Sequence, residues 1–193
     1  MAESTFAELL DGCWRSAVHL EMRDGYMTGD PNYVAWLDGE RPAPGSRPGW
    51  AHRWYEMIGA ARNRGAAVRR ARIVSEPISD YVRFEYDTTE VCNIEAGEEV
   101  RWLPRRYASD LALPGNDFWL FDDSVVLFNH FDGNGNATFR DTSTDPGVVE
   151  LCRVAFEAVW QRAVPHQDYR PTHRLAPRER PPSVGDATLR PEV

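Results

Sequence analysis

The sequence predicts a single α/β domain with a mixed sheet of about five strands, preceded by helices in its N-terminal part. Apolar residues recur near a 3.6-residue period through the first third of the chain, which is typical of helices. Further on, a strand, a helix and a second strand are indicated in turn, and an apolar hairpin pattern leads into a final amphipathic helix. We therefore expect one domain over residues 1–166, with a helical portion at 1–65 and a sheet portion at 66–166.

Three helices are expected in the N-terminal portion. The segment FAELLDGCWRSAVHLEM, residues 6–22, places apolar side chains at helical spacing and predicts the first helix. Asp30-Pro31 predicts the start of a short second helix that runs to Leu37, because Asp caps a helix and Pro fits its first turn. The third helix is expected from Trp50 to Asn63.

The middle of the chain predicts a strand, a helix and a strand. Charged and apolar residues alternate in AAVRRARIVSE, helical spacing returns in PISDYVRFEYDTTEVCNIEAG, and EEVRWLP is again typical of a strand. Parallel strands joined through a helix cross over with a right hand, so the unit from Val68 to Trp102 is expected to be such a crossover.

Two apolar segments, DFWLF and SVVLFNHF, flank Asp122-Asp123 and predict an antiparallel hairpin. A further strand, ATFRDT, is expected after the turn residues DGNGN. The expected inward face of the hairpin consists of Phe118, Leu120, Val126 and Phe128. The aspartates of this region then belong mostly to turns.

The last helix is marked by its ends. Asp145 is the expected N-cap, Pro146 the first helical residue, and Pro165 terminates the segment. Residues 167–193 are rich in Pro and Arg and hold few large apolar side chains, which predicts a disordered tail.

Composition argues against several classes of function. The net charge of −8 disfavours direct nucleic-acid binding, since phosphate contacts need clustered positive charge. No apolar run approaches the roughly 20 residues of a membrane-spanning helix, and MAESTFAELL lacks a secretory pattern, so we expect a soluble cytoplasmic protein with no membrane partner. All 22 basic residues are Arg, which removes lysine chemistry. The three cysteines have no metal-ligand spacing, so reduced buried thiols and no cofactor are expected.

His130 and Asp132 are a candidate acid-base pair. They stand two positions apart in an expected strand, which places both on one face and lets the carboxylate orient the imidazole as a general base. The sequence holds no GxSxG nucleophile motif to accompany them. The turn that follows departs from a calcium loop, with Ala137 where Gly is needed and Ser143 where the bidentate acid belongs, so no metal site is expected.

A second group of candidates is aromatic and basic. The stretch WAHRWY, residues 50–55, mixes aromatic rings with Arg and His, a combination that lines ligand pockets or protein interfaces. The full set of expected ligand- or partner-binding residues is Trp50, Arg53, Trp54, Arg83, Trp102, His130 and Asp132.

Four segments carry a resemblance to a known family: RDGYMTGDP, RRARIVSEPISDYVRFEYDTTEVCNIEAGEEVRWLPR, LPGNDFWLFDDSVVLFNHFDGNGN and AFEAVWQRAVPH. Together they resemble an actinobacterial family of domains of unknown function, numbered six-eight-seven-nine, over about residues 10 to 166. Members of such families are often encoded beside helix-turn-helix regulators and small companion proteins, so the resemblance implies an accessory or regulatory role.

The strand, aspartate turn and second strand of FWLFDDSVVLF also resemble the half-domain of phospholipase-D-like proteins. The catalytic pattern there is H-x-K-x4-D. Counted back from Asp122 or Asp123, the His position holds Gly115 or Asn116, and the Lys position holds Asp117 or Phe118. Because that chemistry needs an imidazole nucleophile and a cation on the phosphate, the resemblance implies the scaffold without the activity.

Two hypotheses follow from the sequence. The first is a non-catalytic regulatory, sensor or accessory domain that binds a small ligand or a partner. The partner is a helix-turn-helix regulator, a small companion protein or a second copy in a homodimer. The alternative is a hydrolase or phosphodiesterase-like enzyme that uses His130 and Asp132.

Overall fold

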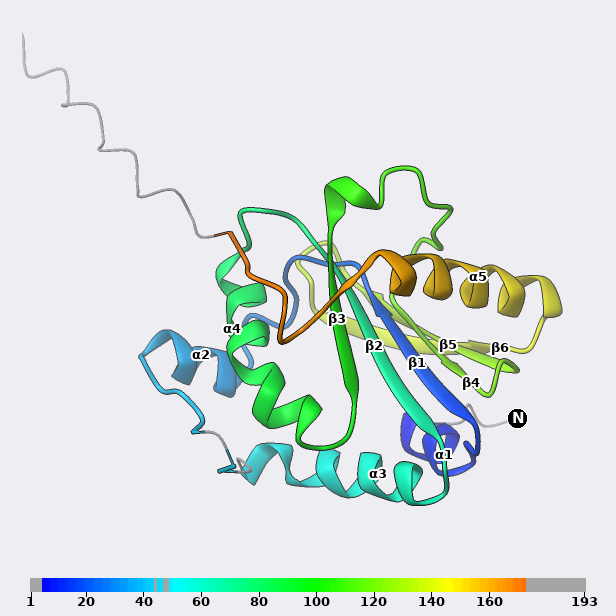
Figure 1. The fold of residues 1–193 in the computed structure, drawn as a ribbon, viewed down its shortest axis with the longest axis horizontal. Coiled ribbons are helices and arrows are strands. Elements are labelled where there is room, and N and C mark those ends of the chain that lie inside the picture. The colour runs from blue at the N-terminus through cyan, green and yellow to red at the C-terminus, as the bar shows by residue number, and fades with distance from the viewer. Residues whose placement is uncertain (1–4, 44, 47–48, 173–193) are drawn as a thin grey trace, which may run out of the picture.

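The computed structural model describes residues 5–43, 45–46 and 49–172, and the backbone but not the side chain of Trp50 (Figure 1). These residues form one seven-stranded mixed sheet in the order β6-β5-β4-β1-β2-β3-β7. The three strands β1, β2 and β3 run parallel to one another, and the other neighbours are antiparallel. The strands are β1 (Ser16–Glu21), β2 (Ala67–Val74), β3 (Glu99–Pro104), β4 (Phe118–Phe121), β5 (Val125–Phe131), β6 (Ala137–Ser143) and β7 (Val164–Pro165).

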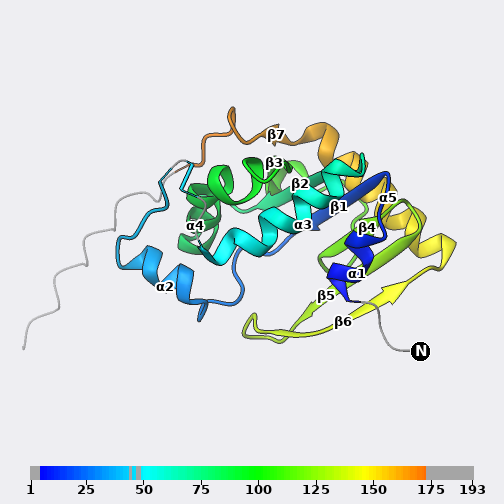
Figure 2. The same ribbon diagram turned by 90° about the horizontal axis from the view of Figure 1, so that it is seen from below.

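Helices cover both faces of the sheet (Figure 2). They are α1 (Phe6–Asp11), α2 (Pro31–Leu37), α3 (His52–Asn63), α4 (Asp80–Thr89) and α5 (Pro146–Arg162), with short turns η1 (Gly49–Ala51), η2 (Glu90–Ile94) and η3 (Arg105–Tyr107). Asp30 and Asp145 cap α2 and α5 through their side chains, as predicted. The predicted single α/β domain is confirmed, whereas the count of about five strands is wrong.

The largest correction concerns residues 6–22, which were expected to form one helix. Here α1 ends at Asp11, and the chain continues as β1, a central strand with β2 on one side and β4 on the other. A strand covered on both faces carries apolar residues on both, so Val18 and Leu20 face α5 while Ala17 faces the other side. That pattern lacks alternation and imitates helical spacing. The predicted helical portion therefore contains a strand.

The C-terminal boundary also differs from the prediction. β7 pairs with β3, and Tyr169 is buried with its ring stacked 5.6 Å from that of Trp102. The indole Nε1 of Trp102 donates a hydrogen bond to His166 Nδ1 at 3.1 Å. Residues 167–172, assigned to a disordered tail, thus include a core residue. The rest of that predicted tail, 173–193, lies outside the described residues.

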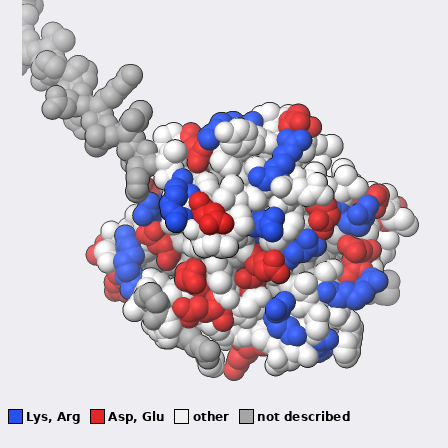
Figure 3. Space-filling view, in the orientation of Figure 1, with Lys and Arg blue, Asp and Glu red and all other residues white. Residues whose placement is uncertain are grey.

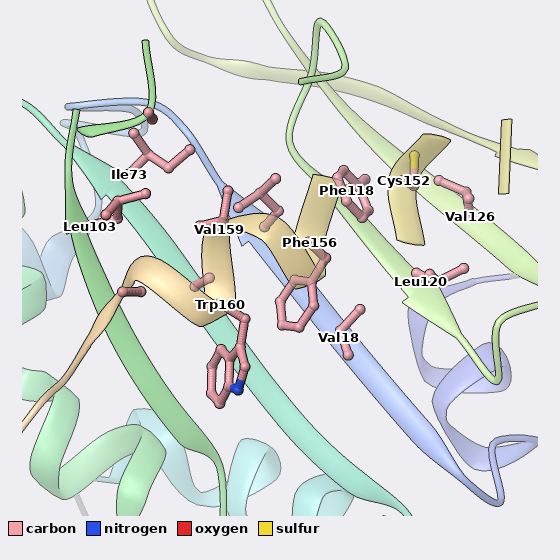
Figure 4. Close-up of a cluster of buried hydrophobic side chains, with 14 of the residues drawn as sticks. Val18, Ile73, Leu103, Phe118, Leu120, Val126, Cys152, Phe156, Val159 and Trp160 are labelled. Carbon is pink, nitrogen blue, oxygen red and sulfur yellow. The ribbon is translucent and has the colours of Figure 1, made fainter. Parts of the chain in front are cut away.

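One face of the sheet holds the main apolar core beneath α5 (Figure 4). Phe156 and Val159 of α5 pack against strand residues that include Val18, Phe118 and Leu120. The predicted inward face of the hairpin is confirmed, with Phe128 partly buried at its edge. This face is mainly apolar, and its arginines are engaged by α5: Arg69 pairs with Glu157 at 2.8 Å, and Arg101 lies over the ring of Trp160.

The opposite face lies beneath α1, α3 and α4 and is partly polar. Buried charged side chains of β1 and β2 stand here beside the apolar residues of β4 and β5. Within the described residues, none of the helices has the length and apolar character needed to cross a membrane.

The predicted turn between β4 and β5 is present, and both of its aspartates have positive φ angles, 49° at Asp122 and 52° at Asp123. The Asp122 carboxylate also accepts backbone hydrogen bonds from Trp14, Arg15 and Ser16 at 2.7–2.9 Å. Burial alone would raise the pKa of Asp122, but these N–H groups lower it to about 2. The carboxylate therefore holds the start of β1 against the hairpin.

We expect Asp122→Asn to lower the free energy of unfolding by about 1–2 kcal/mol, because charge-assisted hydrogen bonds to three N–H groups are weakened at a partly exposed site. The matched control is Asp123→Asn, at the neighbouring exposed position with the same backbone conformation, which should change stability little. Urea unfolding at neutral pH measures both. Equal losses for the two variants would contradict this role of Asp122.

Candidate functional site

The strand register places polar residues in two rows across the sheet face opposite α5. The first row, from β2 to β6, is Arg70, His19, Trp119, Leu127 and Thr142. The second row is Arg72, Glu21, Asp117, Asn129 and Arg140, with Asp117 placed by the backbone hydrogen bond from Asn129 N to its carbonyl oxygen. Residues from five strands therefore meet on one surface.

A buried ion network occupies the β1–β2 side of these rows. Glu21 accepts hydrogen bonds from both Arg70 and Arg72, and Arg70 Nε also donates to Glu98 Oε2 at 2.9 Å. Arg72 lies 3.3 Å from Glu85, a residue of α4. Burial would raise the pKa of Glu21, yet the two guanidinium groups hold it below its ordinary value. Both arginines are thus occupied by carboxylates.

His19 lies beside this network without joining it. Its ring stacks on Trp119 with centroids 4.2 Å apart, and its Nδ1 is 3.2 Å from Glu21 Oε1. That contact lacks the angles of a hydrogen bond, so among the described residues neither ring nitrogen has a hydrogen-bond partner. Burial and then the nearby arginines, Arg140 included, lower the pKa of His19 well below its ordinary value despite the Glu21 charge. The imidazole is therefore neutral, with one donor and one acceptor unused.

A cavity of about 630 Å³ opens over the two rows. Its floor includes His19, Trp119 and Asn129, and its walls come from Phe6 of α1, Trp54 of α3 and the β5–β6 hairpin. The size lies within the range of small-molecule sites, roughly 300–1,000 Å³. His19 thus lines a cavity large enough for a ligand, and both of its ring nitrogens are buried beside it without a hydrogen-bond partner among the described residues.

Asp117 lines the same cavity at the start of β4. Its Oδ1 accepts the backbone N–H of Met22 at 2.9 Å, which joins the end of β1 to β4. Burial, and then the charge of Glu21, raise the pKa of Asp117 to about 7. The group is consequently a weak acid that holds its proton until near neutral pH.

Arg140 stands at the outer end of the second row, on the edge strand β6. Its Nε donates to Asn129 Oδ1 at 2.9 Å, and this contact orients the guanidinium along the cavity wall. For the terminal nitrogens of Arg140 the described residues show no hydrogen bond or ion pair, in contrast to the saturated Arg70. Arg140 is therefore the cation at this cavity that remains open to a ligand.

The predicted pairing of His130 with Asp132 is wrong. His130 Nε2 lies 2.7 Å from Asp141 Oδ1 of β6, while Asp132 accepts from the backbone N–H groups of Asn134 and Asn136 in the turn. A bulge between Asn129 and Phe131 breaks the strand alternation on which the pairing rested. His130 nevertheless lines the cavity.

The other predicted contacts are distributed unevenly. Trp54 lines the cavity and donates its indole N–H to Glu98 at 2.5 Å. Arg53 is exposed on α3, Arg83 pairs with Asp87 on α4, and Trp102 is fully buried in the core. The side chain of Trp50 is not among those described. Of the seven predicted residues, the cavity thus brings together Trp54 and His130.

Two features limit the chemistry open to this site. Within the described part of the chain, no three His, Cys, Asp or Glu side chains come close enough to hold a metal ion. The three cysteines are free and buried, and burial raises the pKa of each thiol. On the face seen in Figure 3, basic and acidic side chains are interspersed.

Comparison with known proteins gives a family. The model of a family described as "Domain of unknown function (DUF6879)" matches residues 4–171. The chain belongs to this family. A comparison with curated proteins finds no match. Among solved structures, this DUF6879 domain resembles a phospholipase D family member, Nuc from Salmonella typhimurium, at 12% identity and a TM-score of 0.46, over 85% of this chain and 88% of that one.

The raised pKa of Asp117 predicts a pH dependence of stability. An acid whose pKa is higher in the folded than in the unfolded state stabilises the fold when it is protonated. The contribution of Asp117 to the free energy of unfolding is therefore complete below pH 3.8 and is lost as the pH rises to about 7. Asp117→Asn keeps an acceptor for Met22 and removes the titration. From pH 4 to pH 7.5, the wild type should lose stability relative to the variant by on the order of 4 kcal/mol. Urea unfolding across this range measures the difference, and a constant difference would contradict the assignment.

Proposed function

We propose that this domain is a non-catalytic sensor or accessory module that binds a small molecule in the cavity above the two polar rows. The observation that carries the proposal is His19, a residue of the cavity lining whose two buried ring nitrogens have no hydrogen-bond partner among the described residues. A buried polar group left unsatisfied costs about 1–3 kcal/mol, and a ligand that pairs with it recovers that cost. The regulatory role, with a helix-turn-helix regulator, a small companion protein or a second copy as partner, is part of the same proposal.

The alternative is a hydrolase, and the contact between His130 and Asp141 at the cavity favours it. A carboxylate that orients an imidazole is the arrangement of a general base. The binding module has the better support because the hydroxyls that line the cavity belong to Thr5, Thr138, Thr142 and Tyr26, none of which is hydrogen-bonded to His130 in the described residues. Arg70, in the cavity lining, is also occupied by carboxylates, so it does not stabilise a developing negative charge.

A fragment titration tests the proposal. Saturation-transfer NMR of the full chain against a general fragment collection should find compounds that bind, are recovered unchanged, and lose binding in Thr142→Trp, which places an indole in the cavity. Thr144→Trp, just beyond β6 and outside the cavity lining, is the matched control and should retain binding.

Three results would overturn the proposal. No fragment binds, or the fragments bind equally well to Thr142→Trp. The third is turnover of a bound compound that His130→Ala abolishes at an unchanged melting temperature, which would establish the hydrolase instead.

A further inference from the structure

We infer that the ligand of this cavity is a planar aromatic carboxylate, bound with its acid group at Arg140 and Asn129 and its ring beside Phe6 and Trp54. This inference rests on the proposed binding function and names the chemical class of the ligand. Four features of the cavity carry it, and they concern the negative charge, the ring, the length of the ligand and the restriction to a single charge.

The negative charge follows from the groups that remain unused. The terminal nitrogens of Arg140 are donors without a partner among the described residues. Asn129 accepts from Arg140 through Oδ1, so its Nδ2 group is left as a further donor, also without a partner among the described residues. The other cation of the floor, Arg70, is already bound by Glu21 and Glu98. Donors therefore dominate the outer end of the cavity, and a guanidinium fork matches a carboxylate in a bidentate arrangement.

The ring follows from the inner end of the cavity. Phe6 and Trp54 line it with rings that are only partly buried, and both pack on the buried Trp119 beneath them, at centroid separations of 4.9 Å and 6.0 Å. Flat apolar walls favour flat apolar ligands, which stack at centroid separations of about 4.5–7 Å. His19 adds two buried ring nitrogens without a hydrogen-bond partner at the same end of the cavity.

The length of the ligand is bounded by the sheet. From β1 to β6 the rows cross three strand spacings, or about 14 Å. A bicyclic ring with a short acid arm is shorter than this span and fits within it.

The restriction to one charge follows from the acids around the site. Glu21 is ionised, and Asp117 titrates near neutral pH beside it in the second row. A single uncommitted arginine balances one negative charge, whereas a phosphate dianion would add a second charge near these carboxylates. A carboxylate is therefore favoured over a phosphate.

Isothermal titration of the full chain with four related probes tests the inference. Indole-3-acetate should bind, tryptophol should bind at least about tenfold more weakly because the acid is replaced by an alcohol, and acetate alone should not bind measurably. Indoxyl phosphate should bind more weakly than the carboxylate at pH 7.5. Binding of the acid should be lost in Thr142→Trp, which locates it in the cavity.

Two variants of Arg140 provide the matched comparison. Arg140→Gln removes the charge and should abolish the preference for indole-3-acetate over tryptophol, while Arg140→Lys keeps a charge and should retain most of it. Arg140 is exposed on an edge strand, so melting temperatures close to the wild type are expected for both.

Several outcomes would overturn the inference. They are equal affinities for the acid and the alcohol, an Arg140→Gln variant that binds the acid as tightly as the wild type, tighter binding of the phosphate, or no binding of any probe to a cavity that does bind fragments. In each of these cases the proposed binding function survives, because the fragment titration tests it separately.

Discussion

Glu21 is shared by two arginines of the neighbouring parallel strand, and the arrangement of the domain depends on this buried contact. Arg70 continues the network to Glu98, at the entry to β3, and Arg72 continues it to Glu85 of α4. An unpaired charge in such a place costs several kcal/mol, so each group requires its partner. The network therefore constrains the register of β1 and β2 and the position of α4. The apolar side of α5 packs on the other face of the sheet, as Figure 4 shows.

The properties of the cavity follow from the same network. Because the arginines are bound by carboxylates, neither hydrogen-bonds to His19, and burial against Trp119 keeps the imidazole neutral. At its inner end the cavity consequently combines the neutral His19 with Glu21 and Arg70, whose charges are paired with each other. Its open cation, Arg140, lies on β6 and is held by Asn129 of β5. This separation of an aromatic end with paired charges from a cationic end is the basis of the proposed ligand class.

The sequence predicted elements whose signals are local, and it failed where the signal depends on neighbours far along the chain. α5 has a side-chain cap at Asp145 and a proline at its start, and β2, β3 and the hairpin alternate clearly, so these were predicted correctly. β1 is buried on both faces and was therefore taken for a helix. Read as a helix, its His19 and Glu21 point in different directions. In a strand, they share a face with Arg70 and Arg72, and this alternation of complementary charges was the signal that could have found the site.

The partner of His130, Asp141, could not be predicted because of the bulge beside His130. No local feature of SVVLFNHFDGNGN marks the extra residue.

The protonation state of His19 is the most direct test of the proposed site. It depends both on the arginines that are occupied by carboxylates and on the ring nitrogens that lack hydrogen-bond partners. Nitrogen-15 NMR of the imidazole rings, with His19 assigned by comparison with His19→Gln, measures protonation and tautomer in the ligand-free chain. We predict that the imidazole protonates only well below its ordinary pKa of 6.5, and that its nitrogen shifts change when a cavity ligand binds. Protonation of His19 with a midpoint at or above the ordinary value of 6.5 would show a charged imidazole paired with Glu21, and would contradict the proposed site.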